Sequence, residues 1–157
     1  MSLTLILIRH AKSDWSDSVQ ADHDRPLNAR GGHDAPLMAE RLSDAGVRPA
    51  VLLSSTAVRA RTTAEAFAER LGVTVRLDPE LYGASADELL AAAVASGSHD
   101  VMVVAHDPGM TELAALLSRG RIDRMPTCAI ATFTWQTDDW AVVAAVDPVS
   151  WEHLVPH

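Results

Sequence analysis

The sequence has little cysteine, which forms the disulfides of small extracellular domains, and fewer basic than acidic residues, whereas nucleic acids attract basic ones. Its 157 residues include a single cysteine, Cys128, which excludes an internal disulfide and a cysteine-based metal site. Lysine and arginine number 13 against 21 aspartates and glutamates, which gives a formal net charge of −8. Because nucleic acids and anionic membranes attract clustered positive charge, this balance argues against both as broad partners.

Long apolar runs and aromatic residues are also scarce. No apolar run approaches the ~20 residues that a membrane-spanning helix needs. The apolar stretch 3–8 ends in charged residues and lacks the basic leader and cleavage site of a secretory signal, so we interpret it as a strand and expect a cytoplasmic protein. With only 4 Trp, 2 Phe and 1 Tyr, the core must be built from aliphatic residues. Length and composition predict one globular domain over residues 1–157.

Short apolar stretches alternate with stretches of helical periodicity along most of the chain. Strands are expected at residues 3–8, 49–53, 73–77 and 100–105, and helices at 29–45, 57–71, 86–95 and 110–118. Asn28 and Ser85 are expected helix N-caps, as is Thr56 or Ser55. Residues 128–134 and 140–146 read as a hairpin. The alternation predicts a three-layer α/β/α fold with a mostly parallel sheet.

Basic side chains follow three of the predicted strands. Arg9 and His10 come directly after the first strand, Arg59 lies one helical turn beyond the end of the second, and His106 follows the fourth. Because the carboxyl ends of parallel strands share one edge of a sheet, these four side chains can converge. Each one taken singly also has a structural interpretation, such as a strand-end arginine that pairs with a surface carboxylate. Helix pairs of Arg59 with Glu65 or of Arg61 with Glu65 are a further alternative.

Two imidazoles and two guanidiniums at one sheet edge suit phosphoryl transfer without a metal. A neutral imidazole can attack phosphorus and become phosphorylated. Guanidiniums hold the non-bridging oxygens, and a second, protonated imidazole donates to another oxygen. Helices that start near Ser55 and Asp107 would add backbone N–H donors to an anion at this edge.

Six segments carry a resemblance to a known family. They are Arg9-His10-Ala11-Lys12-Ser13, Asp24-Arg25-Pro26-Leu27 with Arg30-Gly31, Ser54–Ala60 with Thr63-Ala64, Glu80-Leu81-Tyr82, Val104–Gly109 and Met125-Pro126-Thr127. In this order the segments resemble the histidine phosphatase superfamily, the phosphoglycerate-mutase-like proteins. Alanine at position 11, followed by Lys-Ser, is similar to the superfamily's SixA-type phosphohistidine phosphatases. The resemblance covers residues 3 to about 146 and implies a phosphoglycerate-mutase-like fold.

The resemblance also implies roles for individual residues. His10 would be the nucleophile, and Arg9, Arg59 and His106 would complete the phosphate-binding site. Glu80 is the nearest candidate for the general acid that protonates the leaving group; its alternative is a solvated turn residue. Ser13 either donates its hydroxyl to phosphate or makes a hydrogen bond that closes the loop.

The polar loop 12–30 offers further candidates. Arg25 is interpreted as a structural residue that fixes the loop, and Trp15 either packs against the loop or touches substrate. Asp22-His23-Asp24 superficially resembles a metal site, but no second pair of ligands has matching spacing. The resemblance implies catalysis with no metal and no other cofactor.

The sequence therefore predicts a phosphatase that acts through a phosphorylated His10. Without an insertion long enough to form a large lid, a bulky substrate such as phosphohistidine on a protein is favoured. One alternative is a phosphatase of small phosphomonoesters. From a different class, a non-catalytic module that binds phosphate or phosphoproteins remains open.

Overall fold

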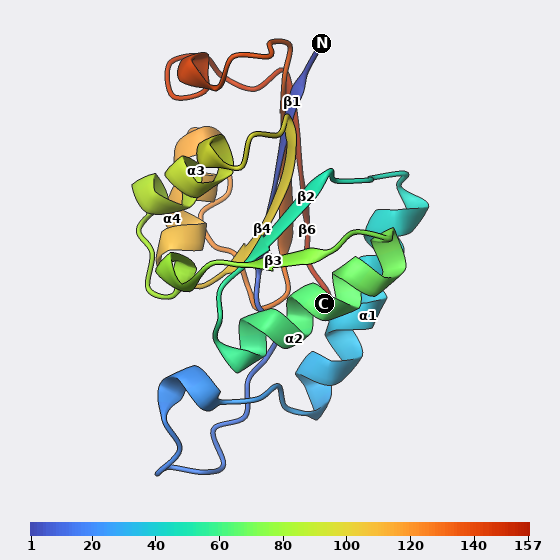
Figure 1. Ribbon diagram of the computed structural model, residues 1–157, viewed down its shortest axis with the longest axis vertical. Helices are drawn as coiled ribbons and strands as arrows, with labels where there is room; N and C mark the ends of the chain where they lie inside the picture. Colours follow the sequence, from blue (N-terminus) through green and yellow to red (C-terminus); the bar gives the residue numbers. More distant parts are fainter.

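The computed structural model describes all 157 residues and contains one six-stranded sheet between two helical layers (Figure 1). The strands are β1 (Leu3–Arg9), β2 (Val51–Ser54), β3 (Val75–Leu77), β4 (Asp100–Ala105), β5 (Ile130–Trp135) and β6 (Ser150–Leu154). The helices are α1 (Ala29–Asp44), α2 (Val58–Leu71), α3 (Ala86–Ala95) and α4 (Gly109–Leu117). Three short 3-10 turns are η1 (Asp22–Asp24), η2 (Pro79–Leu81) and η3 (Trp140–Val142). No helix combines the length and the apolar composition needed to cross a membrane.

The sheet is mostly parallel, as predicted. Its strand order is β3-β2-β4-β1-β5-β6, and β1 to β4 run parallel whereas β5 and β6 are antiparallel to their neighbours. β1 pairs with β4 so that Arg9 lies opposite Ala105, and β2 pairs with β4 so that Ser54 lies opposite Val104. The residues that follow these three strands therefore meet at one edge of the sheet.

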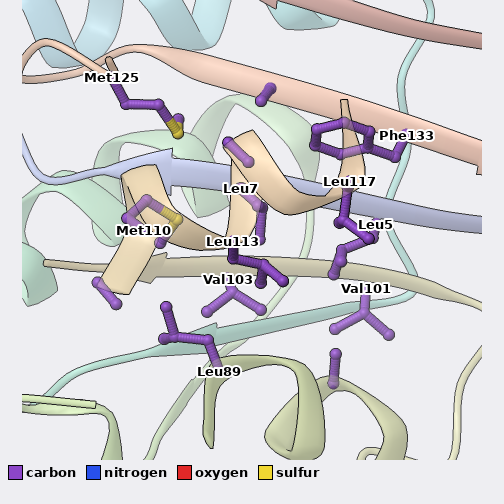
Figure 2. Packing of buried hydrophobic residues seen from close by; sticks show 14 of the residues in the cluster. Leu5, Leu7, Leu89, Val101, Val103, Met110, Leu113, Leu117, Met125 and Phe133 are labelled. Atoms are coloured by element: carbon purple, nitrogen blue, oxygen red, sulfur yellow. The ribbon is translucent and has the colours of Figure 1, made fainter. Parts of the chain in front are cut away.

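Alternation along the central strands divides the core between the two faces of the sheet. Leu5 and Leu7 of β1 pack with α3 and α4, whereas Ile6 and Ile8 pack with α1 and α2. Figure 2 shows the first of these clusters, in which Leu7 lies near Leu113 and Leu5 lies near Leu117, both residues of α4. A continuous apolar run is what a central strand buried on both faces requires. The central strand is thus a rigid support for the residues that follow it.

The predicted hairpin was wrong in its second strand. Residues 140–146 form the η3 turn, and β5 pairs instead with β6, Ser150–Leu154. The Asp139 carboxylate accepts the Ala141 N–H at 2.9 Å, and the Trp140 indole donates to the Ser98 carbonyl at 2.9 Å. With Val143 buried in the core, the apolar run packs beside α3 rather than extending the sheet.

Asn28 and Ser85 cap their helices as expected, whereas Thr56 does not cap α2. The N-cap of α2 is Ala57, which has no capping side chain. The Thr56 hydroxyl lies 2.9 Å from His23 Nε2 instead. The Ser55 hydroxyl accepts the Ala57 N–H at 3.2 Å, just before the helix, and also lies 2.8 Å from His106 Nε2.

The segment between β1 and α1 is closed at its base by backbone contacts. Asn28 N–H donates to the Lys12 carbonyl at 3.0 Å, and Asp14 N–H donates to the Pro26 carbonyl at 2.8 Å. α1 approaches so closely that a Cβ on Gly31 would collide with the Lys12 carbonyl oxygen. Only glycine allows this contact, which explains the Arg30-Gly31 segment.

Replacing Gly31 with alanine is expected to destabilise the protein by roughly 1–3 kcal/mol, because backbone atoms must move to accommodate the new methyl group. Urea denaturation followed by circular dichroism measures this loss. Gly32→Ala is the matched control, because a Cβ at Gly32 meets no atom within 4 Å. Its expected change is a gain of about 0.5–1 kcal/mol from helix propensity. Equal effects of the two substitutions would contradict the close approach.

Candidate active site

The His10 backbone is fixed by strands on both sides. His10 N–H donates to the Ala105 carbonyl of β4 at 3.1 Å, and the His10 carbonyl accepts the Cys128 N–H at 3.0 Å. The next residue is tied to α2, because Ala11 N–H donates to Thr63 Oγ1 at 3.0 Å. The Thr63 hydroxyl donates in turn to the Arg59 carbonyl at 2.8 Å. These contacts fix the relative positions of His10 and Arg59.

The His10 ring is held in its neutral form. Its Nδ1 lies 2.7 Å from the Ala11 carbonyl oxygen, which only accepts hydrogen bonds, so Nδ1 carries the proton. Nε2 then keeps its lone pair, and Arg59 Nε donates toward it at 3.4 Å. Burial, with the Arg59 and Arg9 charges, lowers the pKa of His10 to about 4. At neutral pH, His10 therefore presents an unprotonated Nε2.

The Arg59 guanidinium is oriented by Asp22. Nη1 donates to the Asp22 carbonyl at 2.7 Å, and Nη2 donates to Asp22 Oδ2 at 3.0 Å. A guanidinium has five N–H groups in a planar fork, so the edge formed by Nε and the second Nη2 proton remains for an anion beside His10. Asp22 thus fixes the outer edge of Arg59 and leaves its inner edge available.

The second imidazole, His106, lies beside the first, with ring centroids 5.1 Å apart. Its Nε2 is 2.8 Å from the Ser55 hydroxyl, whereas its buried Nδ1 has no hydrogen-bond partner. Burial, followed by the charges of His10 and Arg59, lowers the pKa of His106 to about 3. His106 is therefore neutral in the protein by itself, not protonated as predicted. A phosphoryl dianion against the ring would favour the protonated form.

Arg9 is oriented by contacts with distant segments. Its Nη1 donates to the Met125 carbonyl at 3.0 Å and lies 3.5 Å from Asp107 Oδ2. Asp107 accepts hydrogen bonds from the Thr111 N–H and hydroxyl, both at 2.9 Å. Met125 N–H donates to the same Thr111 hydroxyl at 3.0 Å. This network accounts for the Met125-Pro126-Thr127 segment and shows that Asp107 stabilises the first turn of α4.

Two site residues were missed by the sequence analysis, Asp22 and Tyr82. The Tyr82 hydroxyl donates to Asp22 Oδ2 at 2.5 Å, and its ring centroid lies 5.4 Å from that of His106. The hydrogen bond from Tyr82, together with Arg59, lowers the pKa of Asp22. Tyr82 belongs to the Glu80-Leu81-Tyr82 segment, so the segment was identified but the functional member was not.

The structure does not bring Glu80 to the imidazoles. Glu80 is exposed in η2 and lines a cavity of about 430 Å³ with Arg76, Asp78 and Glu88. Its only hydrogen bond runs from its own N–H to Asp78 Oδ1, at 3.0 Å. Ser13 is likewise apart from the imidazoles.

Ser13 and Arg25 both organise the loop. Ser13 Oγ accepts the Trp15 indole N–H at 2.9 Å, which is the loop-closing alternative of the sequence analysis. Arg25 donates to the Asp17 carbonyl at 3.0 Å and lies 4.1 Å from the centre of the Trp15 ring. Arg25 is buried, whereas Trp15 is 64% exposed. The structural interpretation of Arg25 matches these contacts.

The Asp22-His23-Asp24 segment makes protein contacts of its own. Asp22 pairs with Arg59, while His23 bonds Thr56 and lies 3.6 Å from Asp24. No group of three or more His, Cys, Asp or Glu side chains is arranged to hold a metal ion. The positive charge facing an anion at this site comes from the two guanidiniums.

Comparisons with known proteins agree with this geometry. The model of the histidine phosphatase superfamily, branch 1, matches residues 5–89. An uncharacterized chloroplastic protein of Arabidopsis thaliana is 32% identical over 166 residues, covering 97% of this chain and 76% of that protein. A probable phosphoglycerate mutase GpmB of Serratia proteamaculans is 37% identical over 81 residues, but these cover 50% of this chain and 37% of that protein.

Solved structures extend the similarity to the whole fold. The SixA protein of Agrobacterium tumefaciens superposes with a TM-score of 0.81 at 29% identity, covering 99% of each chain. The protein histidine phosphatase SixA complexed with tungstate superposes with a TM-score of 0.73 at 28% identity, covering 85% of this chain and 88% of that chain. With the matched family model, these similarities show that the chain belongs to the histidine phosphatase superfamily, of the SixA type, and is a phosphatase.

Proposed function

We propose that this phosphatase hydrolyses phosphohistidine on proteins through a phosphorylated His10. The observation that carries the proposal is the pairing of a neutral nucleophile with an ionised carboxylate. His10 Nε2 is unprotonated, and Asp22, the carboxylate that bonds Arg59 beside it, has a lowered pKa. Such a site can attack phosphorus, but its carboxylate is a poor acid for an alkoxide leaving group.

In the first half of the reaction, His10 Nε2 attacks phosphorus. As the ring becomes a phosphoimidazolium, its Nδ1–H stays bonded to the Ala11 carbonyl, which stabilises the developing positive charge. The inner edge of Arg59 would hold the non-bridging oxygens, with Arg9 adding positive charge. His106 would take up a proton as the anion arrives and donate to a further oxygen.

The leaving group decides which substrates suit the site. Phosphate esters of alcohols depart as alkoxides and need a proton donor, whereas an imidazole nitrogen departs readily without a strong acid. Tyr82 and Arg59 hold Asp22 ionised, so Asp22 does not supply that proton. A phosphoramidate such as phosphohistidine is therefore the substrate class that we favour. The name of the tungstate-bound relative, a protein histidine phosphatase, supports this choice.

In the second half of the reaction, water attacks the phosphorus of phospho-His10. The P–N bond breaks, its electron pair returns to Nε2, and inorganic phosphate leaves. We propose that this cycle requires no metal or other cofactor, since Arg9, Arg59 and the two imidazoles supply the positive charge. We also propose a cytoplasmic site of action, because Cys128 is an unpaired thiol, which suits a reducing compartment.

His10→Ala is expected to lower hydrolysis of 4-nitrophenyl phosphate by on the order of 10⁴-fold or more, as removal of a nucleophile does elsewhere. Rapid base quenching of wild-type enzyme with ³²P-labelled substrate should trap a phosphoenzyme that the variant lacks, and subsequent acid treatment should release its label as phosphate. His33→Ala, at an exposed position of α1, is the matched control. Retained turnover in a folded His10→Ala protein would contradict the role of His10 as nucleophile. Failure of the wild-type enzyme to acquire ³²P label would contradict it too.

The substrate class is tested by comparing a histidine-phosphorylated protein with a panel of small phosphomonoesters. We expect kcat/KM to be highest for the phosphohistidine protein, because its leaving imidazole needs no strong acid. Preference for one small ester would favour the alternative of a small-molecule phosphatase. Binding without turnover of any substrate would favour the non-catalytic phosphoprotein-binding module.

Glu80→Gln tests the general acid that the family resemblance implies. Since Glu80 lies in a separate cavity, we expect less than about a twofold change for aryl phosphates with either good or poor leaving groups. The slope of log kcat/KM against leaving-group pKa measures the effect. A steeper slope in the variant would return Glu80 to the mechanism as the proton donor.

A further inference from the structure

A row of rings leads from the base of the site to the surface. The ring centroids of His10 and His106 are 5.1 Å apart, those of His106 and Tyr82 5.4 Å, and those of Tyr82 and His23 5.0 Å. His10 and His106 are each 7% exposed, whereas Tyr82 is 39% exposed. The row of rings therefore runs from two buried imidazoles to a partly exposed phenol.

The Asp22 carboxylate lies at the outer end of this path. Its Oδ2 accepts hydrogen bonds from the Tyr82 hydroxyl and Arg59 Nη2. Its Oδ1 accepts none and has only Arg25 Nε nearby, at 3.9 Å. Because the side chain is 46% exposed, Oδ1 is accessible to a ligand. The carboxylate thus has one occupied and one available oxygen.

The Arg59 guanidinium links this available oxygen to the nucleophile. Its Nε lies beside His10 Nε2, and its Nη2 donates to Asp22. One guanidinium and two hydrogen bonds therefore separate the attacking nitrogen from the carboxylate. A phosphorylated imidazole whose phosphoryl group lies on the Nε and Nη2 edge of Arg59 can therefore have its ring near Asp22, which bonds the same guanidinium.

We propose that Asp22 recognises the leaving group of a phosphohistidine substrate by accepting a hydrogen bond from the ring nitrogen that does not carry phosphorus. This role rests on the proposed function, because alkyl and aryl phosphates have no such N–H. Asp22 would be a catalytic residue that touches the substrate, in addition to orienting Arg59.

The chemistry of the leaving group gives this contact its effect. A phosphoimidazole protonated on its far nitrogen has a cationic ring, and this ring departs as neutral imidazole when the P–N electron pair moves onto the near nitrogen. The far nitrogen keeps its proton throughout, so no acid is needed at the breaking bond. The same arrangement holds on the enzyme side, where the Ala11 carbonyl accepts the Nδ1–H of phospho-His10. Phosphorus would thus pass between two imidazoles, each supported by an acceptor oxygen.

The charges around Asp22 keep it ionised for this purpose. Asp22 is contacted by Arg59 of α2, by Arg25 of the same loop and by the Tyr82 hydroxyl. The charge of Asp22 also acts on His106, and His23 packs against the Tyr82 ring. The Tyr82 hydrogen bond, followed by Arg59, lowers the pKa of Asp22. An anionic Asp22 favours the protonated, cationic form of the substrate imidazole because opposite charges attract.

The test compares phosphoimidazole with 4-nitrophenyl phosphate as substrates of wild-type protein and Asp22→Asn. We expect the ratio of kcat/KM for phosphoimidazole to that for 4-nitrophenyl phosphate to fall about tenfold, since a nearby opposite charge stabilises a cation by about one pKa unit or more. In the pH profile of kcat, which reports the enzyme–substrate complex, the alkaline limb for phosphoimidazole should move about one pH unit lower, because without the carboxylate the bound substrate loses its proton more easily. The 4-nitrophenyl phosphate profile should show no corresponding movement.

Two controls separate recognition from a general disturbance of the loop. Asp24→Asn removes a neighbouring carboxylate in the same η1 turn and should leave the ratio unchanged. Tyr82→Phe removes the hydroxyl that bonds Oδ2 and should keep the alkaline limb within about half a pH unit of its wild-type position, because the carboxylate remains. Asp22→Asn could instead lower kcat/KM equally for both substrates and leave the alkaline limb for phosphoimidazole unmoved. That result would show that Asp22 only orients Arg59, and it would overturn the recognition role. Wild-type protein that hydrolyses 4-nitrophenyl phosphate but not phosphoimidazole would instead overturn the substrate class itself.

Discussion

The pairing of β1 with β4 is the constraint on which the site depends. Arg9 lies opposite Ala105 in this pair of strands. His10 and His106 are the next residues after β1 and β4, so they must leave the sheet side by side. The His10 N–H donates to the Ala105 carbonyl and continues the ladder by one residue. Both strands are buried on both faces, so this register cannot slip without exposing the core. Two imidazoles 5.1 Å apart follow directly from strand register.

Burial of these imidazoles has an electrostatic consequence. Low polarity around His10 and His106, reinforced by the guanidiniums, disfavours protonation of either ring. The same two guanidiniums that keep His10 neutral would also attract the phosphoryl group in the proposed reaction. One set of charges therefore prepares both the nucleophile and its target. Histidine can act here as a nucleophile without an adjacent general base.

The sequence alone predicted the fold and the centre of the site because both depend on local patterns. Apolar runs such as residues 3–8 and 100–105 identify buried strands, and parallel strands bring Arg9, His10, Arg59 and His106 to one edge. Asp22 and Tyr82 were missed because their contact joins residues 60 positions apart. An aspartate in a polar loop is indistinguishable from a solvated one until its partners are known. The last strand was misplaced because residues 140–146 are apolar enough for a strand yet pack beside α3.

The closed base of the segment between β1 and α1 has an evolutionary consequence. Hydrogen bonds between residues 12 and 28 and between residues 14 and 26 tie its two ends together, so the nucleophile does not depend on the length of the chain between them. Closing a longer loop costs little additional entropy, since the cost grows only with the logarithm of its length. The part between these bonds can therefore change in length while the closed base keeps His10 in place. Insertions or deletions there can alter which substrates fit, provided that a carboxylate still orients Arg59 as Asp22 does.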